Sequence, residues 1–329
     1  MNYTVNANPA VKKILDTVKS HSLGNGEYTR YTLRGEKKSN EYGCADAANI
    51  LYTVGAFERD EVRRKAAINA LRAFQDPETG LFDEGTHHPI HCTAHCTAAL
   101  ELFDAAPLHP LIALKKYSDV KGLYSLLNSL EWVNDPWPAA HAGAGIYAAL
   151  VLTGGADEKW SDAYFNYLES NADPETGIGR RGAVKAGIKP VNHHLNGWFH
   201  YLFNFSFSRR PFPYAEKLID ECIRMYDENI MPSSFGQSVG FQEIDWVYAL
   251  NRAAEKTGYR YNEAKDRLRK FARSYFDFIF TVPVTDKNWD DLHMLFGLSC
   301  AVAELQLALP GEIRTEYPLK NVLDRRPFI

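Results

Sequence analysis

One pentapeptide occurs twice in this chain of 329 residues, and it sets the scale of the fold. Asp-Pro-Glu-Thr-Gly stands at 76–80 and again at 173–177, 97 residues further along. Each copy follows an amphipathic stretch and precedes a polar loop, and Asp-Pro and Thr-Gly are dipeptides typical of turns. Self-similarity at a fixed period indicates a repeat architecture, so we expect structural units of about 48 residues.

Six segments at roughly this period are rich in alanine, glycine, leucine and aromatic residues on all sides, as expected of helices that are buried all round. They cover 39–55, 87–105, 135–154, 191–207, 239–258 and 288–309. The charged stretches between them keep a single apolar stripe, which is typical of helices with one face toward solvent. These outer helices are expected near 9–20, 58–75, 110–132, 157–170, 212–230 and 260–280.

Alternating outer and inner helices without strand-like patterns predict an all-α fold. An open array would leave a buried-type helix exposed at each end, so we expect closure into an (α/α)6 toroid of six helical hairpins. We expect one domain over 1–329, with an extended tail over about 310–329. The hairpin period and the Gln75…Gly80…Phe82 turn resemble the toroids of six-hairpin glycosidases, alginate-lyase-like enzymes and terpenoid cyclases. Such an architectural resemblance does not fix the function.

Charge and composition exclude several classes of partner. The net charge of −4, with lysines and arginines scattered among acids, argues against nucleic acid. The first residues lack a charged stretch followed by an apolar run, and no segment approaches about 18 apolar residues in a row, so we expect a cytoplasmic protein without membrane contact. Phosphate-binding motifs are missing, and no cofactor is expected.

Histidine is concentrated in the segments expected to form inner helices. Nine of the eleven histidines lie there: His87, His88, His91, His95, His141, His193, His194, His200 and His293. An imidazole is costly to bury without a partner and is useful as an acid, base or ligand near neutral pH. Because hairpin repeats place all inner-helix N-termini on one side, these side chains predict a polar site at that end.

Two histidines and two cysteines share one segment at helical spacing. His91 and His95, and Cys92 and Cys96, stand four residues apart, a spacing that can hold zinc on one face of a helix. No second cluster follows at a suitable distance, so the sequence favours packing of the cysteines, with one histidine reaching the site. We therefore expect no metal.

Four carboxylates open the last two inner segments and could supply paired acid and base groups for hydrolysis. These are Glu243, Asp245, Asp290 and Asp291. A glycosidase needs one carboxyl to protonate the glycosidic oxygen and another to activate water or attack the sugar. Asp245 stands between Ile244 and Trp246, apolar neighbours that raise a carboxyl pKa, so it is the expected general acid. A buried ion pair with Arg252 or with a lysine of an outer helix is the alternative.

Aromatic and polar side chains beside the same helix starts predict substrate contacts. Aromatic rings stack on sugars or shield a carbocation, although core packing is the alternative for at least half of these. The expected binding residues are Tyr42, His87, His88, Trp137, His141, His194, Trp198, Trp246 and Trp289.

The segment Val191-Asn192-His193-His194-Leu195-Asn196-Gly197-Trp198 is similar to the Asn-His motif of alginate-lyase-like toroids. In those enzymes, as the resemblance implies, asparagine helps to neutralise a uronate carboxyl group, a histidine or tyrosine removes the C5 proton, and a tyrosine protonates the leaving oxygen. Asn192 and His193, with Tyr248 and Arg252 of the next inner segment, match these roles in part. The match is partial because a second histidine follows His193 and because Tyr248 and Arg252 lie far into their helix.

The sequence thus predicts an enzyme that cleaves a glycosidic bond in a small or oligomeric saccharide. Hydrolysis by paired carboxylates leads, and β-elimination from a uronate is the close alternative. A terpenoid-cyclase-like enzyme and a non-catalytic binding toroid stay open.

Overall fold

The computed structural model describes residues 4–35 and 37–329, and it is mostly helical. The all-α prediction is therefore confirmed. Within these described ranges, none of the helices combines the length and the hydropathy of a membrane span.

The six predicted inner segments all form helices, with ends trimmed by a few residues. They are α2 (Glu41–Thr53), α4 (Pro89–Glu101), α6 (Pro136–Leu152), α8 (Val191–Phe207), α10 (Gln242–Thr257) and α12 (Leu292–Ala308). Local chemistry sets where they begin. Asn40 caps α2 by accepting the Gly43 N–H, and Asp291 caps α12 by accepting the His293 N–H. Proline opens α4 and α6, where its fixed φ suits the first turn.

The outer helices also lie where the sequence predicts them, with one exception. They are α1 (Asn8–His21), α3 (Glu61–Arg72), α7 (Glu158–Asn171), α9 (Ala215–Asp227) and α11 (Tyr261–Thr281). The expected helix at 110–132 is instead a 3-10 turn, η1 (Ile112–Tyr117), followed by α5 (Val120–Ser129). The break has a physical cause: Asp119 caps α5, and Gly122 lies so close to the Lys116 carbonyl oxygen that a Cβ there would approach it to 1.9 Å.

The prediction of no strands is wrong at two short places. β2 (Ser22–Gly24) and β3 (Glu27–Tyr28) form an antiparallel hairpin. Its turn is Asn25-Gly26, with φ of 50° and 79°. This dipeptide favours such turns and was a signal available in the sequence. β1 (Val5–Asn6) pairs in parallel with β4 (Ile313–Arg314), which the sequence did not indicate.

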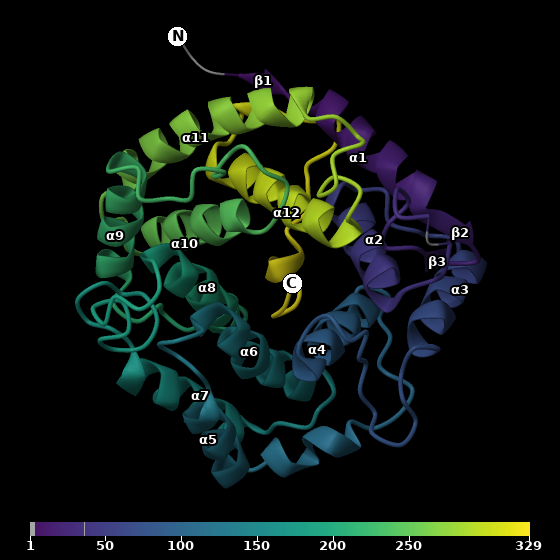
Figure 1. Cartoon of the computed structure of the whole chain (residues 1–329), viewed down its shortest axis with the longest axis horizontal. Helices are drawn as coiled ribbons and strands as arrows, with labels where there is room; N and C mark the ends of the chain where they lie inside the picture. Colours follow the sequence, from purple (N-terminus) through teal and green to yellow (C-terminus); the bar gives the residue numbers. More distant parts are fainter. Residues whose placement is uncertain (1–3, 36) are drawn as a thin grey trace. The chain divides into compact units, whose positions relative to one another are not determined.

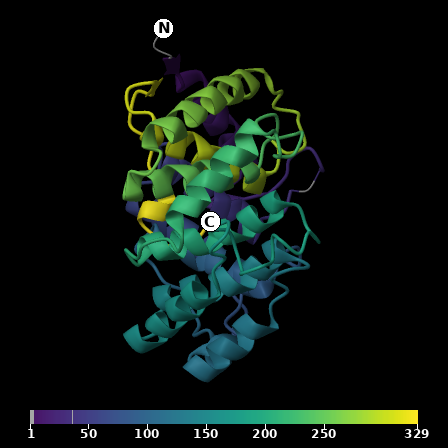
Figure 2. The ribbon, with the colours of Figure 1, turned by 90° about the vertical axis from the view of Figure 1, so that its left-hand side faces the viewer.

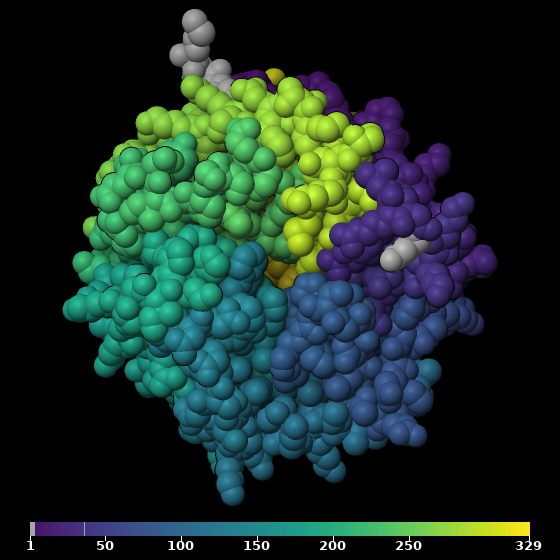
Figure 3. Space-filling view, in the orientation of Figure 1, coloured from purple at the N-terminus to yellow at the C-terminus, as the bar shows by residue number. Residues whose placement is uncertain are grey.

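The chain divides into two compact units, each made of two chain segments. Unit 1 comprises Met1–Leu71 and Cys222–Val322. In unit 1, α12 packs against both α2 and α10, and α1 and α11 lie outside them (Figure 1). The space-filling view shows α1 and α11 forming the upper rim of this unit (Figure 3).

Unit 2 comprises Arg72–Glu221 and Leu323–Ile329. Here α6 packs against both α4 and α8, and α5 and α7 lie outside them, as seen from two directions in Figures 1 and 2. Close backbone approaches fix how these helices meet. A Cβ on Gly197 would lie 2.5 Å from the Pro136 carbonyl oxygen, and Asn204 donates to the Ala144 carbonyl. The contact on α6 moves from Pro136 to Ala144 as the contact on α8 moves from Gly197 to Asn204. The two helices therefore run in parallel and are offset along their axes.

Gly197 therefore supports the packing of unit 2. We expect Gly197→Ala to lower the free energy of unfolding by about 2 kcal/mol or more, because the added methyl meets rigid backbone and pushes α8 from α6. The matched control is Gly145→Ala on α6, where a Cβ would lie 3.2 Å from its nearest neighbours on Ile90. That variant should change stability by less than about 1 kcal/mol, because better helix propensity offsets the tight contact. Equal chemical-denaturation midpoints for both variants would contradict this account.

Candidate functional site

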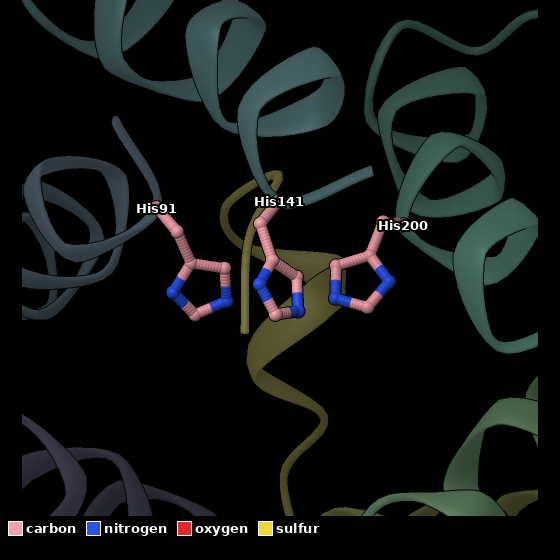
Figure 4. Close-up of side chains that lie close together, drawn as sticks. All are labelled: His91, His141 and His200. Atoms are coloured by element: carbon pink, nitrogen blue, oxygen red, sulfur yellow. The ribbon is translucent and has the colours of Figure 1, made fainter. Parts of the chain in front are cut away.

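Three histidines from three different helices of unit 2 converge on one region. His91 of α4, His141 of α6 and His200 of α8 each offer a ring nitrogen, and these three atoms lie within 4.8 Å of one another. The ring centroids are 4.4 Å apart for His91 and His141, 5.4 Å for His141 and His200, and 6.3 Å for His91 and His200. Figure 4 shows the rings side by side. We call these residues the histidine triad.

The offset between the helices explains why these three positions meet. Ile90, in the first turn of α4, lies beside Gly145 in the third turn of α6, and Pro136 at the start of α6 lies beside Gly197 in the second turn of α8. Each helix of this series is therefore shifted along its axis relative to the one before. His91 lies in the first turn of α4, His141 in the second turn of α6 and His200 in the third turn of α8, and their side chains meet between the helices.

Burial differs within the triad and favours the uncharged form of His91. His91 and His200 are buried, whereas His141 is half-exposed. Burial lowers the pKa of His91 well below its usual value, and the neighbouring histidines, beginning with His141, lower it further. A neutral imidazole keeps one lone pair, so it can act as a base or as a metal ligand.

One hydrogen bond fixes the tautomer of His200. Its Nδ1 lies 2.8 Å from the carbonyl oxygen of Asn196. A carbonyl oxygen only accepts, so Nδ1 carries the proton and donates, and Nε2 keeps the lone pair.

A second level of rings lies nearer the N-terminal ends of the same helices. His193 stands seven residues before His200, and Trp137 stands four before His141, so each shares a helix face with a triad member. The Trp137 and His193 rings meet edge to face at 6.4 Å. Both side chains are half-exposed, like His141 and unlike the buried His91 and His200.

His87 belongs to the same group of rings. It stacks on His91 with centroids 5.2 Å apart, and it lies 5.9 Å from His141. Its Nδ1 is 3.0 Å from Oε1 of Glu84, which orients the ring. We call His87, Trp137, His193 and the triad the histidine wall.

The C-terminal segment of unit 2 contributes an apolar contact to the triad. The buried Phe328 ring lies 4.9 Å from His91 and 6.5 Å from His200, both edge to face. Arg325 anchors the segment by donating to the Glu101 carboxylate and to Asp104. No sequence pattern indicated that this segment would reach the histidines, because more than 100 positions separate Phe328 from His91 and from His200.

Two of the carboxylates expected to act in hydrolysis are engaged in structural contacts. Asp291 accepts from Nε and Nη2 of Arg30 at 2.8 and 3.0 Å, and both side chains are buried. Asp290 accepts the backbone N–H groups of Thr32 and Leu33 and the Thr32 hydroxyl. These bonds tie the loop before α2 to the start of α12, within unit 1.

Glu243 and Asp245 lie in the first turn of α10 in unit 1, and both are completely buried. Glu243 Oε1 accepts from the Gly236 N–H and the Ser238 hydroxyl, but burial outweighs these bonds and raises the pKa of Glu243 to about 7. Burial, and then the nearby Glu243, raise the pKa of Asp245 well above its usual value. Burial therefore favours the neutral acid form of Asp245, but the side chain is shut off from solvent.

Most of the predicted binding aromatics serve as core residues. Trp246 donates to the Cys222 carbonyl and Trp289 to the Thr17 hydroxyl, and both rings are fully buried. Tyr42 is equally buried and packs edge to face on His293 at 4.7 Å. Trp198 is buried in unit 2. Of the predicted aromatics, Trp137 alone is half-exposed among the described residues.

The remaining predicted residues divide between the two units. Tyr248 is buried in unit 1, and Arg252 forms an ion pair with Glu304 through its Nε, 2.6 Å from Oε1. In unit 2, Asn192 and His194 are buried beside His193, and burial lowers the pKa of His194 to about 4. His88 is exposed and caps α4 by accepting the Ile90 N–H.

The i, i+4 pattern in α4 singled out His91, which belongs to the triad, but it suggested partners on the same helix. Cys92 and Cys96 are completely buried, as the packing interpretation expects. His91 meets His141 and His200 on other helices instead of pairing with a cysteine on its own. His200 was counted among the clustered histidines, but no motif singled it out.

No known protein family, no curated protein and no solved structure matches this chain. The site must therefore be interpreted from its own chemistry.

The contacts of Asp291 predict a structural rather than a catalytic role. We expect Asp291→Asn to lower the free energy of unfolding by about 3 kcal/mol, because asparagine can still cap α12 but leaves the buried Arg30 charge without a counter-ion. Urea denaturation measures the change, with Asp277→Asn on the exposed face of α11 as the control. A loss below about 1 kcal/mol would show that the pair does not hold unit 1 together, and would return Asp291 to the catalytic candidates.

Glu243 predicts a pH dependence of stability. Its pKa is about 7 in the folded protein, against an ordinary value of 4.5. The folded state therefore binds a proton that the unfolded state has lost, and the free energy of unfolding falls as pH rises from 4.5 toward 7, by roughly 3 kcal/mol. We expect Glu243→Gln to make this decline shallower, whereas Glu216→Gln on the surface leaves it unchanged. Parallel pH profiles for wild type and Glu243→Gln would refute the assignment.

Proposed function

We propose that this chain is an enzyme that cleaves glycosidic bonds, and that its reaction centre is the histidine wall of unit 2. The observation that carries the proposal is the convergence of imidazoles from α4, α6 and α8 on one region, beside the half-exposed Trp137 and His193. Clustered titratable groups with shifted pKa values are typical of functional sites. A half-exposed tryptophan beside them suits contact with the apolar face of a sugar ring.

The geometry favours β-elimination from a uronate over hydrolysis by paired carboxylates. Asp290 and Asp291 are held by hydrogen bonds and an ion pair, and Glu243 and Asp245 are closed off from solvent. The Asn192-His193 pair, in contrast, lies at the start of α8 beside Trp137. Elimination needs a base and a positive charge near the uronate carboxylate, and it does not need two acids facing each other.

In this proposal His193 is the base. Its imidazole takes the proton from C5 of the uronate, and the electrons of that C–H bond form the C4=C5 double bond. The C4–O bond breaks with its electron pair on the leaving oxygen, which then takes up a proton. The reaction is redox-neutral and consumes no water. Trp137 would position the sugar ring against His193.

We also propose that the hairpins close into the (α/α)6 toroid that the sequence pattern predicts. Support comes from the alternation of buried inner and amphipathic outer helices throughout the described ranges, and from the parallel, offset packing of α4, α6 and α8. Each further inner helix would then continue this series.

An assay with uronate-containing oligosaccharides tests the proposed reaction. Elimination creates a conjugated unsaturated uronate, which absorbs in the ultraviolet, whereas hydrolysis gives only new reducing ends. We expect His193→Ala to lower kcat at least about a hundredfold, as for loss of a general base. Trp137→Ala should raise KM roughly tenfold through lost stacking, with a smaller effect on kcat.

His109→Ala serves as the control, since His109 is half-exposed in the loop after α4 and lies outside the histidine wall. Reducing ends that appear without ultraviolet absorbance would replace elimination by hydrolysis. Full activity in His193→Ala would remove His193 from the mechanism.

A further inference from the structure

We propose that His91, His141 and His200 form a binding site for a divalent transition-metal ion of the zinc class. The site lies entirely within unit 2, and it stands whether or not the chain cleaves glycans. It revises the expectation from the sequence that no metal is bound.

The spacing of the three rings matches what such an ion requires. Zinc binds imidazole nitrogen at about 2.0 Å in tetrahedral geometry, which holds the centres of the ligating rings about 5 Å apart. The observed centroid distances of 4.4, 5.4 and 6.3 Å lie on both sides of that value. The three nitrogen atoms, within 4.8 Å of one another, need to move inward by about 1 Å in total, which small side-chain rotations supply.

The donor set selects the class of metal. Imidazole nitrogen suits zinc, copper, nickel, cobalt and iron, whereas calcium and magnesium require oxygen ligands. Three neutral imidazoles carry no charge to offset a divalent ion, so a bound ion keeps its net positive charge.

One ligand is already oriented by its surroundings. The Nδ1–H of His200 donates to the Asn196 carbonyl one turn earlier in α8, so Nε2 presents its lone pair. Metal-ligating histidines generally use their second nitrogen in this way, because the hydrogen bond fixes the ring and makes it a stronger ligand. The contact lies within a single helix and forms before any ion binds.

The surroundings of the triad divide it into a closed side and an open side. Phe328 covers His91 and His200 on the apolar side and keeps water from that face of the rings. His141 is half-exposed, as are Trp137 and His193. Three protein ligands with a fourth position open to solvent is the arrangement of catalytic rather than structural zinc sites.

The proposed ion also deepens the proposed function, on which this one step rests. Elimination requires that the negative charge of the uronate carboxylate be offset, and a bound divalent ion supplies positive charge below the level of His193 and Trp137. The triad would hold the ion, and His193, on the same face of α8 as His200, would take the proton.

Metal binding is tested on the full chain without any substrate. The protein is stripped with a chelator, and Zn²⁺ is added in a calorimetric titration, with Co²⁺ in parallel to report coordination geometry by its visible absorption. We expect one equivalent of Zn²⁺ to bind, and the intense d–d bands of tetrahedral Co²⁺ to appear and then to disappear when Zn²⁺ displaces it.

Two variants and one control locate the site. His141→Ala and His141→Gln should weaken Zn²⁺ binding at least about a hundredfold and abolish the tetrahedral Co²⁺ spectrum. His141 is chosen because it is the half-exposed ligand, and circular dichroism of the metal-free proteins checks that both variants fold. His109→Ala, which removes a half-exposed histidine elsewhere in unit 2, should bind as the wild type does.

Each outcome decides the proposal. A wild type that binds Zn²⁺ no more tightly than His141→Ala overturns the metal site. So does a Co²⁺ spectrum that persists in folded His141→Gln, since the ion would then lie elsewhere. If Zn²⁺ binds at the triad but uronate glycans are not cleaved, the metal site stands and the proposed function fails.

Discussion

The close, parallel packing of α4, α6 and α8 is the constraint on which the site depends. Gly145 of α6 lies against the side chain and backbone of Ile90 in α4, and Gly197 of α8 lies against the backbone of Pro136 in α6. These two close approaches show the axial offset between the helices. That offset brings residues from the first, second and third turns together. The close approach of α6 and α8 at Gly197 thus contributes to the arrangement in which the histidines meet.

Buried charge is handled differently in the two units. In unit 1 the charge is neutralised by pairing. Arg30 pairs with Asp291, and Arg252 pairs with Glu304, each with little exposure to solvent. At Glu243 and Asp245, burial raises the carboxyl pKa and favours the neutral acid. In unit 2 burial lowers the pKa of His91 and favours its neutral imidazole, which costs less to bury than a charged group and keeps a lone pair for chemistry.

This difference explains why the carboxylates that the sequence singled out are weak catalytic candidates. An acidic residue at the start of a helix can serve as an N-terminal cap or as a catalytic group, and the sequence pattern is the same for both roles. Asp291 does cap α12, and it also neutralises an arginine that is distant in the chain but adjacent in unit 1. Sequence spacing could not reveal Arg30 as its partner, because 261 positions separate the two residues.

The sequence by itself determined the helices, since burial on every side of α2, α4, α6, α8, α10 and α12 and the single apolar stripe of the outer helices are properties of local periodicity. It also placed histidine at the inner-helix starts. Tertiary structure alone decided that His91 meets His141 and His200 instead of a cysteine on its own helix, and that Phe328 covers them. The reason is physical: the axial offset between packed helices and the return of a distant segment depend on contacts between elements, which no periodicity within one element encodes.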